Sequence, residues 1–217
     1  GSTLTYGTYL GTSADEFDGT HQLAVDAQGN AFLVGFTNSP SFPVTPGAFQ
    51  GTFGGGTSND NTISKFGPAG QLLASTYLGG SGGDLVEGIA VDTQGNVYCS
   101  GQTDSSNFPV TSNAYRTVKS AGKDAVWFKL SGDLTQLLYS TYMGGTSDDL
   151  FRSCMVDGNG NLYTGGIVNS SNWPVLNANQ GVMGGAAQDA MLVRFTLNRS
   201  PLIISLPSAA PNPTPLR

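Results

Sequence analysis

Basic residues are scarce in this sequence, and so are charged residues in general. Only nine of the 217 residues are Lys or Arg, fifteen are Asp or Glu, and the formal net charge is −6. Nucleic acids and anionic membrane surfaces are bound by clustered basic side chains, so we expect neither as a partner. No apolar run reaches the roughly 18 residues that a membrane-spanning helix needs, so we also expect no membrane insertion.

The residues and motifs that most often carry catalysis are rare as well. Histidine occurs once, at His21, and no serine or cysteine stands with an identifiable base. The glycines follow no phosphate-binding pattern. We therefore predict that the protein is not an enzyme, has no catalytic, cofactor-binding or metal-binding residues and uses no cofactor. His21 is interpreted as a bystander on a strand.

Glycine, by contrast, is abundant at 31 residues, and the sequence repeats itself. Four patterns recur in one phase over three copies, at intervals of 64 to 68 residues. They are TYLGT at 8–12, TYLGG at 76–80 and TYMGG at 141–145; VDxxGN at 25–30, 91–96 and 156–161; FPVT at 42–45 and 108–111 with WPVL at 173–176; and an Asp five residues before a basic residue, at 60, 124 and 189. A fixed period of this length indicates a repeat architecture.

Each copy reads as four short strands. A short apolar strand ends in an Asp-x-x-Gly-Asn turn, a second strand follows as in a hairpin, and two more come after a long connection. The expected strands are 21–26, 30–36, 61–66 and 71–78 in the first copy, 87–92, 96–102, 124–130 and 135–143 in the second, and 152–157, 161–167, 189–195 and 201–205 in the third. Four antiparallel strands per repeat are typical of a propeller blade.

On these motifs the chain resembles the bacterial seven-bladed β-propeller repeat (SBBP-type) family. The second copy carries the family pattern almost throughout, with STYLGG at 75–80, GIAVD at 88–92, FP at 108–109 and DA…KL at 124–130. The third copy departs from it, because Trp173 replaces Phe and SCMVD replaces GIAVD. The resemblance spans about residues 3–206. It implies a propeller-type fold in a secreted or surface-displayed bacterial protein, and it implies no catalytic residues.

We therefore predict an all-β fold, a partial propeller of three four-stranded antiparallel blades of about 65 residues each. A single domain is expected over residues 1–206, with blade one at 21–78, blade two at 87–143 and blade three at 152–206. The proline-rich residues 207–217 are expected to form a tail.

An extra outer strand is predicted at residues 3–10, because LTYGTYL matches the last strand of a blade without the other three before it. Natural propellers close with about four to eight blades, so three cannot close a ring. Three interpretations of this strand follow. The chain is a piece cut from a longer propeller and the strand belongs to a missing blade, or the strand adds to a second copy in a polymer or in a six-blade pair. In the third interpretation the strand packs back on blade one. The predicted interaction strand comprises Leu4, Thr5, Tyr6, Gly7, Thr8, Tyr9 and Leu10.

Two sets of carboxylates recur in phase. They are Asp26, Asp92 and Asp157, which open the Asp-x-x-Gly-Asn turns, and Glu16, Asp84 and Asp149, with Asp15 and Asp148 beside two of these. Such residues can bind calcium, hold another cation or form an acid–base pair. Because they occupy equivalent places in a repeat, we interpret both sets as turn caps.

The long connection in each copy carries an aromatic residue, Phe42, Phe108 or Trp173. We interpret these residues as plugs in the flank of each blade, with stacking on sugars as the alternative. Cys99 and Cys154 fall on strands of neighbouring blades, so they either form a disulfide, which needs α-carbons within about 7 Å, or remain two buried thiols. Asn169 and Asn198 match the N-glycosylation pattern.

These observations predict a non-enzymatic structural protein, extracellular or on a bacterial cell surface. It is expected to associate with itself, as a homo-oligomer or polymer, by adding its N-terminal strand to a neighbouring subunit, as in a filament or surface layer. The alternative is a fragment of a larger propeller that binds glycans or other surface proteins through its loops. An enzyme is a distant third, because it would need titratable groups clustered at the propeller axis.

Overall fold

A computed structural model describes residues 1–12, 16–56 and 58–197, although the side chains of residues 16–21 are not described. The described chain is all-β and contains no helix, hence none that could cross a bilayer. Its strands are β1 (Glu16–Val25), β2 (Ala31–Thr37), β3 (Asp60–Phe66), β4 (Leu72–Leu78), β5 (Asp84–Val91), β6 (Val97–Thr103), β7 (Asp124–Leu130), β8 (Leu137–Met143), β9 (Leu150–Val156), β10 (Leu162–Val168) and β11 (Asp189–Phe195).

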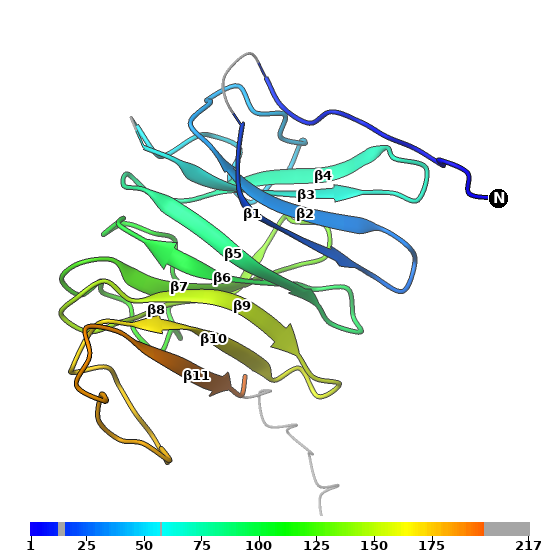
Figure 1. Ribbon diagram of the computed structural model, residues 1–217. Helices are drawn as coiled ribbons and strands as arrows, with labels where there is room; N and C mark the ends of the chain where they lie inside the picture. Colours follow the sequence, from blue (N-terminus) through cyan, green and yellow to red (C-terminus); the bar gives the residue numbers. More distant parts are fainter. Residues whose placement is uncertain (13–15, 57, 198–217) are drawn as a thin grey trace, which may run out of the picture.

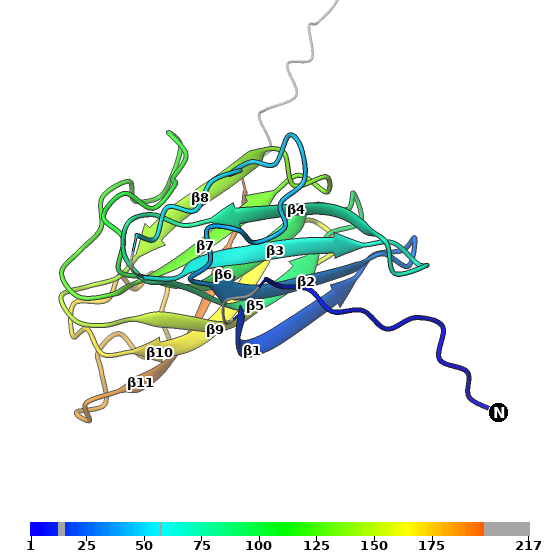
Figure 2. The same cartoon turned by 90° about the horizontal axis from the view of Figure 1, so that it is seen from above.

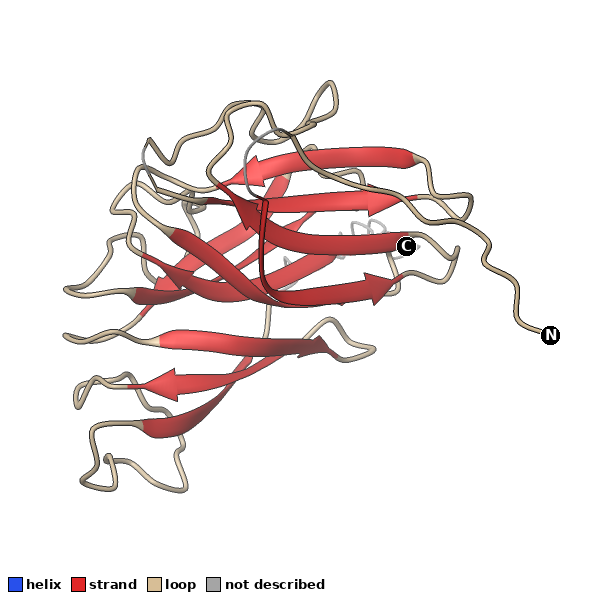
Figure 3. Ribbon diagram, turned by 45° about the horizontal axis from the view of Figure 1, so that its top comes forward, coloured by secondary structure: helices blue, strands red, loops and turns tan. Residues whose placement is uncertain are grey.

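The strands form three antiparallel sheets, one from each sequence repeat. Sheet one has the order β1-β2-β3-β4, sheet two β5-β6-β7-β8 and sheet three β9-β10-β11. The sheets lie one above the other in sequence order (Figure 1), and all regular structure is strand (Figure 3). The first strand of each sheet contacts the first strand of the next, β1 with β5 and β5 with β9. The prediction of four antiparallel strands per repeat is therefore confirmed for sheets one and two.

The turn after the first strand of each sheet requires glycine. Gly29, Gly95 and Gly160 have φ angles of 79°, 83° and 80°. A side chain with a Cβ is strained in this left-handed region, whereas glycine is not. This is why the Gly of the Asp-x-x-Gly-Asn pattern recurs at every copy and why the following strand starts where the sequence predicts, within one residue.

Two hydrophobic cores lie between the sheets. The first joins Phe32 and Ile63 of sheet one to Ile89 and Phe128 of sheet two. The second joins the other side of sheet two to sheet three and contains Tyr98, Trp127, Phe151, Cys154 and Leu162. Sheet two is thus covered on both sides, whereas sheets one and three each contribute one side to a core. We call the side of a sheet toward the preceding sheet its front face and the other its back face.

Two predicted features are not seen in the described chain. Residues 1–12 form no strand in this single chain and run away from the sheets toward the N-terminus (Figures 1 and 2). The strand expected at 201–205 and the tail at 207–217 lie outside the described residues. Sheet three therefore has three strands within the described part of the chain, and β11 is its last.

Candidate functional site

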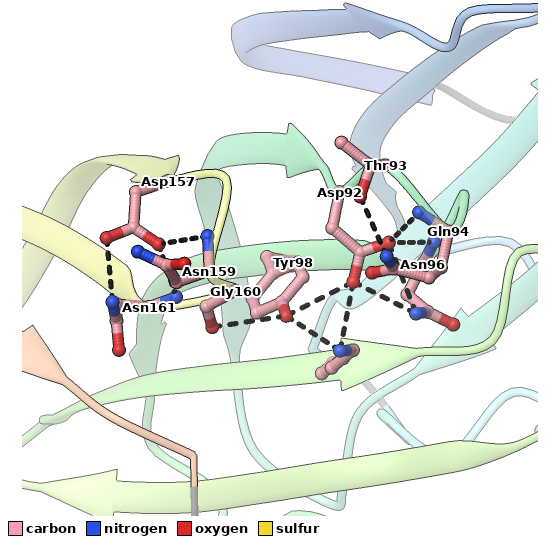
Figure 4. A network of polar contacts seen from close by, with 10 residues as sticks. Asp92, Thr93, Gln94, Asn96, Tyr98, Asp157, Asn159, Gly160 and Asn161 are labelled. Carbon is pink, nitrogen blue, oxygen red and sulfur yellow. Dashed lines mark hydrogen bonds and ion pairs between the residues drawn. The ribbon is translucent and has the colours of Figure 1, made fainter. Parts of the chain in front are cut away.

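The turn after the first strand of each sheet is closed by its aspartate. Asp92 Oδ1 accepts hydrogen bonds from the backbone N–H groups of Gln94 (3.0 Å) and Asn96 (2.8 Å), and the Asn96 amide donates to Oδ2 (2.9 Å), as Figure 4 shows. Asp26 and Asp157 accept the equivalent backbone hydrogen bonds. The three carboxylates therefore cap their own turns.

A cation and an aromatic ring stand beside this turn. Lys129 of β7 lies 3.0 Å from Asp92 Oδ2 and donates to the Tyr98 hydroxyl at 2.7 Å, and its Nζ is 4.5 Å from the ring centroid. The Tyr98 hydroxyl also lies 3.5 Å from the carbonyl oxygen of Gly160 in the next repeat (Figure 4). The equivalent cation–ring pairs are Lys65 with Phe32 and Arg194 with Tyr163. This explains the basic residue near the end of each third strand.

Two buried carboxylates meet where sheet one joins sheet two. Asp60 begins β3 and Asp84 begins β5, and their exposed fractions are 0% and 1%. A Cβ placed on Gly79 would lie 2.6 Å from Asp60 Oδ1 and 2.7 Å from Asp84 Oδ2, so these oxygens are at most about 5.3 Å apart. Only glycine fits between them, which explains the first glycine of TYLGG.

Asp84 connects three segments through hydrogen bonds. Its Oδ2 accepts from the Gly80 backbone N–H (2.7 Å) and from the Ser105 hydroxyl (3.0 Å), and its Oδ1 accepts from the Thr103 hydroxyl. Gly80 lies just after the last strand of sheet one, whereas Thr103 ends the second strand of sheet two and Ser105 lies two residues after it. The carboxylate therefore fixes the crossing from one sheet to the next.

Only one of the two carboxylate oxygens of Asp60 accepts hydrogen bonds from the described residues. Its Oδ2 accepts from the Gly54 N–H (2.7 Å) and the Gln50 amide (3.0 Å), but its Oδ1 has no partner among the described residues. Burial raises the pKa of Asp60 to about 6 and that of Asp84 to about 7. In weakly acidic solution this pair therefore carries at least one proton.

The second sheet junction repeats the arrangement. Asp149 Oδ2 accepts from the Gly145 N–H (2.8 Å) and the Ser170 hydroxyl (2.6 Å). A Cβ on Gly144 would lie 2.5 Å from Asp124 Oδ1, which again has no partner among the described residues. Burial raises the pKa of Asp124. Asp124 and Asp149 are both fully buried, so the two junctions are built alike.

These pairs are suited to holding sheets together. A substrate cannot reach carboxylates that solvent does not reach, and general acid–base catalysis needs that contact. Over the described residues, no group of three or more His, Cys, Asp or Glu side chains could hold a metal ion. Asp148 instead accepts a hydrogen bond from the Lys123 N–H at 2.9 Å, near the surface. Asp15 lies outside the described residues, and the side chains of Glu16 and His21 are not described.

The sequence contained the signal for these pairs, but it was divided between two patterns. In the sequence, Asp60 and Asp124 belong to the pattern of an Asp five residues before a basic residue, whereas Asp84 and Asp149 belong to the predicted turn caps. Each pair is formed by residues 24 or 25 positions apart that belong to adjacent repeats. A periodic pattern shows which residues are equivalent, but it does not show which ones meet across a sheet junction.

The aromatic residues of the long connections are packed inside. Phe42 and Phe108 are 4% and 2% exposed, and Trp173 is half-buried with its ring 6.0 Å from that of Phe151. A buried ring offers no face to a sugar, so Phe42 and Phe108 act as plugs. The hydroxyl of Tyr77 holds the first plug by accepting from the Phe42 N–H at 2.9 Å.

The candidate covalent sites are two cysteines and two asparagines. Cys99 and Cys154 are free and buried, and burial raises the pKa of Cys154 to about 12. The Cys154 thiol lies 3.6 Å from the carbonyl oxygen of Tyr98. Asn169 follows β10 and is half-buried, and its buried Oδ1 has no partner among the described residues, whereas Asn198 lies outside them.

The predicted interaction segment is exposed. Leu4, Tyr6 and Tyr9 are 84%, 38% and 103% exposed. The segment still approaches sheet one: the ring of Tyr6 lies so near Gly70 that an added Cβ would be 2.7 Å from it, and Thr12 Oγ1 donates to Ser39 Oγ at 3.0 Å. Its residues line a shallow groove over the front face of sheet one, together with Leu23, Ala31, Leu33 and Phe66.

The two outer faces of the stack are apolar and exposed. On the front face of sheet one, Leu23 and Val25 are 61% and 59% exposed. On the back face of sheet three, Met155, Tyr163 and Leu192 are 73%, 36% and 79% exposed. In sheet two the equivalent faces are covered by sheets one and three, so the exposed faces at the two ends correspond to faces that are buried in sheet two.

Comparison with known proteins agrees with the repeat pattern. A family model described as a beta-propeller repeat (SBBP) matches residues 75–109, from the end of β4 through β5 and β6 to the plug at Phe108. No curated protein matches the chain. The matched segment contains the Asp84 junction and the Asp92 turn, the two polar features that define each sheet. The chain therefore contains a β-propeller repeat of the SBBP type.

Proposed function

We propose that this is a non-enzymatic structural protein whose three repeats form three blades of a partial propeller and whose copies associate head to tail. The observation that carries the proposal is the pair of exposed apolar faces at opposite ends of the stack. Leu23 on the front face and Leu192 on the back face are equivalent to residues that are buried between sheets. A second copy is the natural cover, because the front of one copy matches the back of another.

The exposed N-terminal segment supports the same proposal. Residues 3–10 carry the pattern of a last strand, yet they pair with no strand in the described part of the chain. An unpaired segment of this kind can add to the edge of a neighbouring sheet. A head-to-tail contact is heterologous, so it produces a ring if the rotation closes and a filament if it does not. An extracellular or cell-surface filament or layer subunit of a bacterium is the role we propose.

Deletion of residues 1–11 tests the proposal. The full chain should give large particles or a defined oligomer by light scattering and negative-stain imaging, whereas the deleted chain should be monomeric with an unchanged far-ultraviolet circular dichroism spectrum. A matched control deletes the same number of residues from the C-terminus, 207–217, and should assemble normally. Assembly of the chain that lacks residues 1–11 would contradict strand addition.

A second candidate is a glycan- or protein-binding module. The long connection of the third repeat exposes apolar side chains, with Val175, Leu176 and Val182 at 54%, 88% and 78%. A monomeric full chain that binds a glycan array or an extracellular protein, and loses this binding on Leu176→Asp, would favour this candidate over self-association.

A further inference from the structure

Resting on the proposed self-association, we infer that the acceptor of the N-terminal segment is the β11 edge of a second copy. Residues 4–10 would pair antiparallel with β11 and become the fourth strand of that copy's third sheet. The inference rests on two sets of contacts that the first two repeats make with their own fourth strands. The third repeat has the groups for both sets, and within the described residues no fourth strand contacts them.

The first set concerns the tyrosine of the fourth strand. The Tyr77 hydroxyl donates to the Ser39 carbonyl oxygen at 2.8 Å, and the Tyr142 hydroxyl donates to the Ser105 carbonyl oxygen at 2.8 Å. Both serines start the turn that carries the aromatic plug. The third repeat forms this turn as well, because the Trp173 N–H donates to the Ser170 carbonyl oxygen at 3.1 Å. No tyrosine hydroxyl reaches that carbonyl from the described part of the chain.

The second set concerns the threonine before that tyrosine. Thr76 Oγ1 accepts from the Gln50 N–H, and Thr141 Oγ1 accepts from the Arg116 N–H, each at 2.9 Å. The Gln50 side chain also receives the N–H of Gly79 on its Oε1 at 3.0 Å. These bonds attach the end of the fourth strand to the long connection.

The third repeat holds a glutamine in the same arrangement. Gln180 Nε2 donates to the Val182 carbonyl oxygen (2.8 Å) and approaches Asp189 Oδ2 (3.4 Å), as Gln50 Nε2 donates to Thr52 and Asp60. Within the described residues, nothing donates to Gln180 Oε1 or pairs with its backbone N–H. The groups that would hold a threonine and a glycine are therefore in place at the β11 edge.

Residues 4–10 carry the side chains that these groups require. LTYGTYL at 4–10 aligns with LLASTYL at 72–78 and LLYSTYM at 137–143, so Thr8 and Tyr9 fall on the Thr-Tyr pair, and Gly11 falls on Gly79. The chain's own residues 202–208, LIISLPS, align over the leucine and the serine but have leucine and proline at the Thr-Tyr positions. The N-terminal segment of a second copy is thus the better match.

The position of the segment fits an occupant that comes from another copy. Thr12 contacts Ser39 at the front of sheet one, and the equivalent Gly80 contacts Ser105 at the front of sheet two. The N-terminal segment therefore stands in front of sheet one, where the last strand of a preceding sheet would lie. Stacking the front of one copy on the back of another covers Leu23 and Leu192 and brings the segment to the neighbour's β11 in the same movement.

The first two repeats also fix the register. Ile63 pairs with Thr76, and Trp127 pairs with Thr141. The equivalent pair at the proposed interface is Leu192 of one copy with Thr8 of the other. Cross-strand neighbours have Cβ atoms about 4.5–5.5 Å apart, which is within the reach of a disulfide after small adjustments.

Mixed-chain disulfide trapping tests the register. One chain carries Leu192→Cys and the other Thr8→Cys, and the two are mixed under mild oxidation; Thr5→Cys, three residues off register, replaces Thr8→Cys in the matched control. We expect at least tenfold more heterodimer with Thr8→Cys than with Thr5→Cys. The wild-type chain, whose two cysteines are buried, gives the background. Equal trapping of the two variants would overturn the β11 inference.

Further arms separate this inference from the proposed function. If deletion of residues 1–11 abolishes assembly while trapping shows no preference for Thr8→Cys, the acceptor edge is wrong and strand addition stands. If the full chain does not assemble at all, both fail. If a single chain with Leu192→Cys and Leu206→Cys forms an internal disulfide as a monomer, the chain's own C-terminal residues hold the edge, and the inference is overturned.

Removal of one hydroxyl gives a second readout. Tyr9→Phe should weaken association about tenfold by loss of a buried hydrogen bond, without changing the melting temperature of the monomer. Tyr77→Phe removes the equivalent hydroxyl within one chain and should lower the melting temperature while leaving association intact. Unchanged association in Tyr9→Phe would contradict the docking of Tyr9 on the Ser170 turn.

Discussion

Sheet two and its two neighbours are built from the same repeat, but they differ in what covers them. Ile63, Trp127 and Leu192 occupy one position in the three repeats, and their exposed fractions are 0%, 0% and 79%. On the opposite face, Leu23 is 61% exposed, whereas the equivalent Ile89 is 7% exposed. The residue type is apolar at each place, so burial is decided by whether an adjacent sheet exists.

This difference shows which faces are not covered by a sheet of the described chain. In repeat architectures, stability is close to a sum of intrinsic repeat terms and interfaces between neighbours, so an end repeat has one interface fewer. Terminal repeats of a monomeric protein usually carry a polar outer face. Sheets one and three carry apolar outer faces instead, and this contrast with sheet two is the observation behind the proposed self-association.

Truncation of the central tryptophan should give the largest effect. Trp127 is fully buried and stacks on Tyr139 with ring centroids 4.5 Å apart, so Trp127→Ala should lower the free energy of unfolding by about 3–5 kcal/mol. Leu192→Ala at the equivalent place in sheet three should change it by less than about 0.5 kcal/mol. Chemical denaturation at low protein concentration measures both, and similar losses in the two variants would refute the contrast.

Loss of the cation at the sheet-two turn should rank second. Burial works against the charge on Asp92, but hydrogen bonds from Asn96 and Lys129 outweigh it and lower the pKa of Asp92. The side chains of Asp92 and Lys129 are 3% and 15% exposed, so Lys129→Met leaves a buried carboxylate unpaired and should cost about 3 kcal/mol. Lys123→Met breaks an exposed pair with Asp104 at 3.8 Å and should cost at most about 0.5 kcal/mol.

The melting temperatures of these two variants give the check. If Lys123→Met is as destabilising as Lys129→Met, exposure does not control the strength of these ion pairs, and the turn network of sheet two has no special structural role.

The sequence predicted the strands well because they depend on local patterns. The turns at Gly29, Gly95 and Gly160 fix the first hairpin of each repeat, and the third strands at 124–130 and 189–195 were predicted with their observed bounds. The first strands begin earlier than predicted, at Asp84 instead of 87 for example, because Asp84 is held by hydrogen bonds from the preceding loop and not by the apolar pattern.

The sheet junctions were not predictable in the same way. The meeting of Asp60 with Asp84 depends on how one sheet stacks on another, and no spacing along the chain encodes that distance. Burial of Phe42 and Phe108 was predicted from their recurrence and is confirmed. The strand at residues 3–10 was predicted from its similarity to 72–78, but pairing needs a partner edge, and in the described chain the β11 edge lies at the opposite end of the stack (Figure 1).

The buried carboxylate pair should make stability depend on pH. Burial raises the folded-state pKa of Asp84 to about 7 and of Asp60 to about 6, above the value of about 3.9 for an unfolded chain. The folded state therefore binds more protons than the unfolded state between these values. The stabilisation from these groups is fully present below about pH 4 and is lost as the pH rises toward 7.

Melting temperature measured from pH 5 to pH 8 tests this sign. It should fall with increasing pH, and Asp84→Asn should reduce the slope at least by half because the amide does not titrate. Asp104→Asn, at an exposed aspartate whose side chain is 45% exposed, is the matched control and should leave the slope unchanged. A melting temperature that rises over this range would show that the pair is not buried as a protonated unit.

The smallest effect on monomer stability is expected at the two ends, and there it is the most informative. Leu23→Ser and Leu192→Ser alter side chains that are 61% and 79% exposed, so each should change the free energy of unfolding by less than about 0.5 kcal/mol. Ile89→Ser, at the buried equivalent of Leu23, should be strongly destabilising because it places a hydroxyl in the first core.

If the end faces cover each other, both end variants should nevertheless weaken self-association about tenfold in light-scattering titrations, since each removes apolar area that only a second copy buries. Association that is unaffected by either change would mean that the end faces are not the interface. An end variant with unchanged monomer stability but weaker association therefore identifies a residue that contacts a second copy, whereas unchanged stability and unchanged association identify one that is simply exposed.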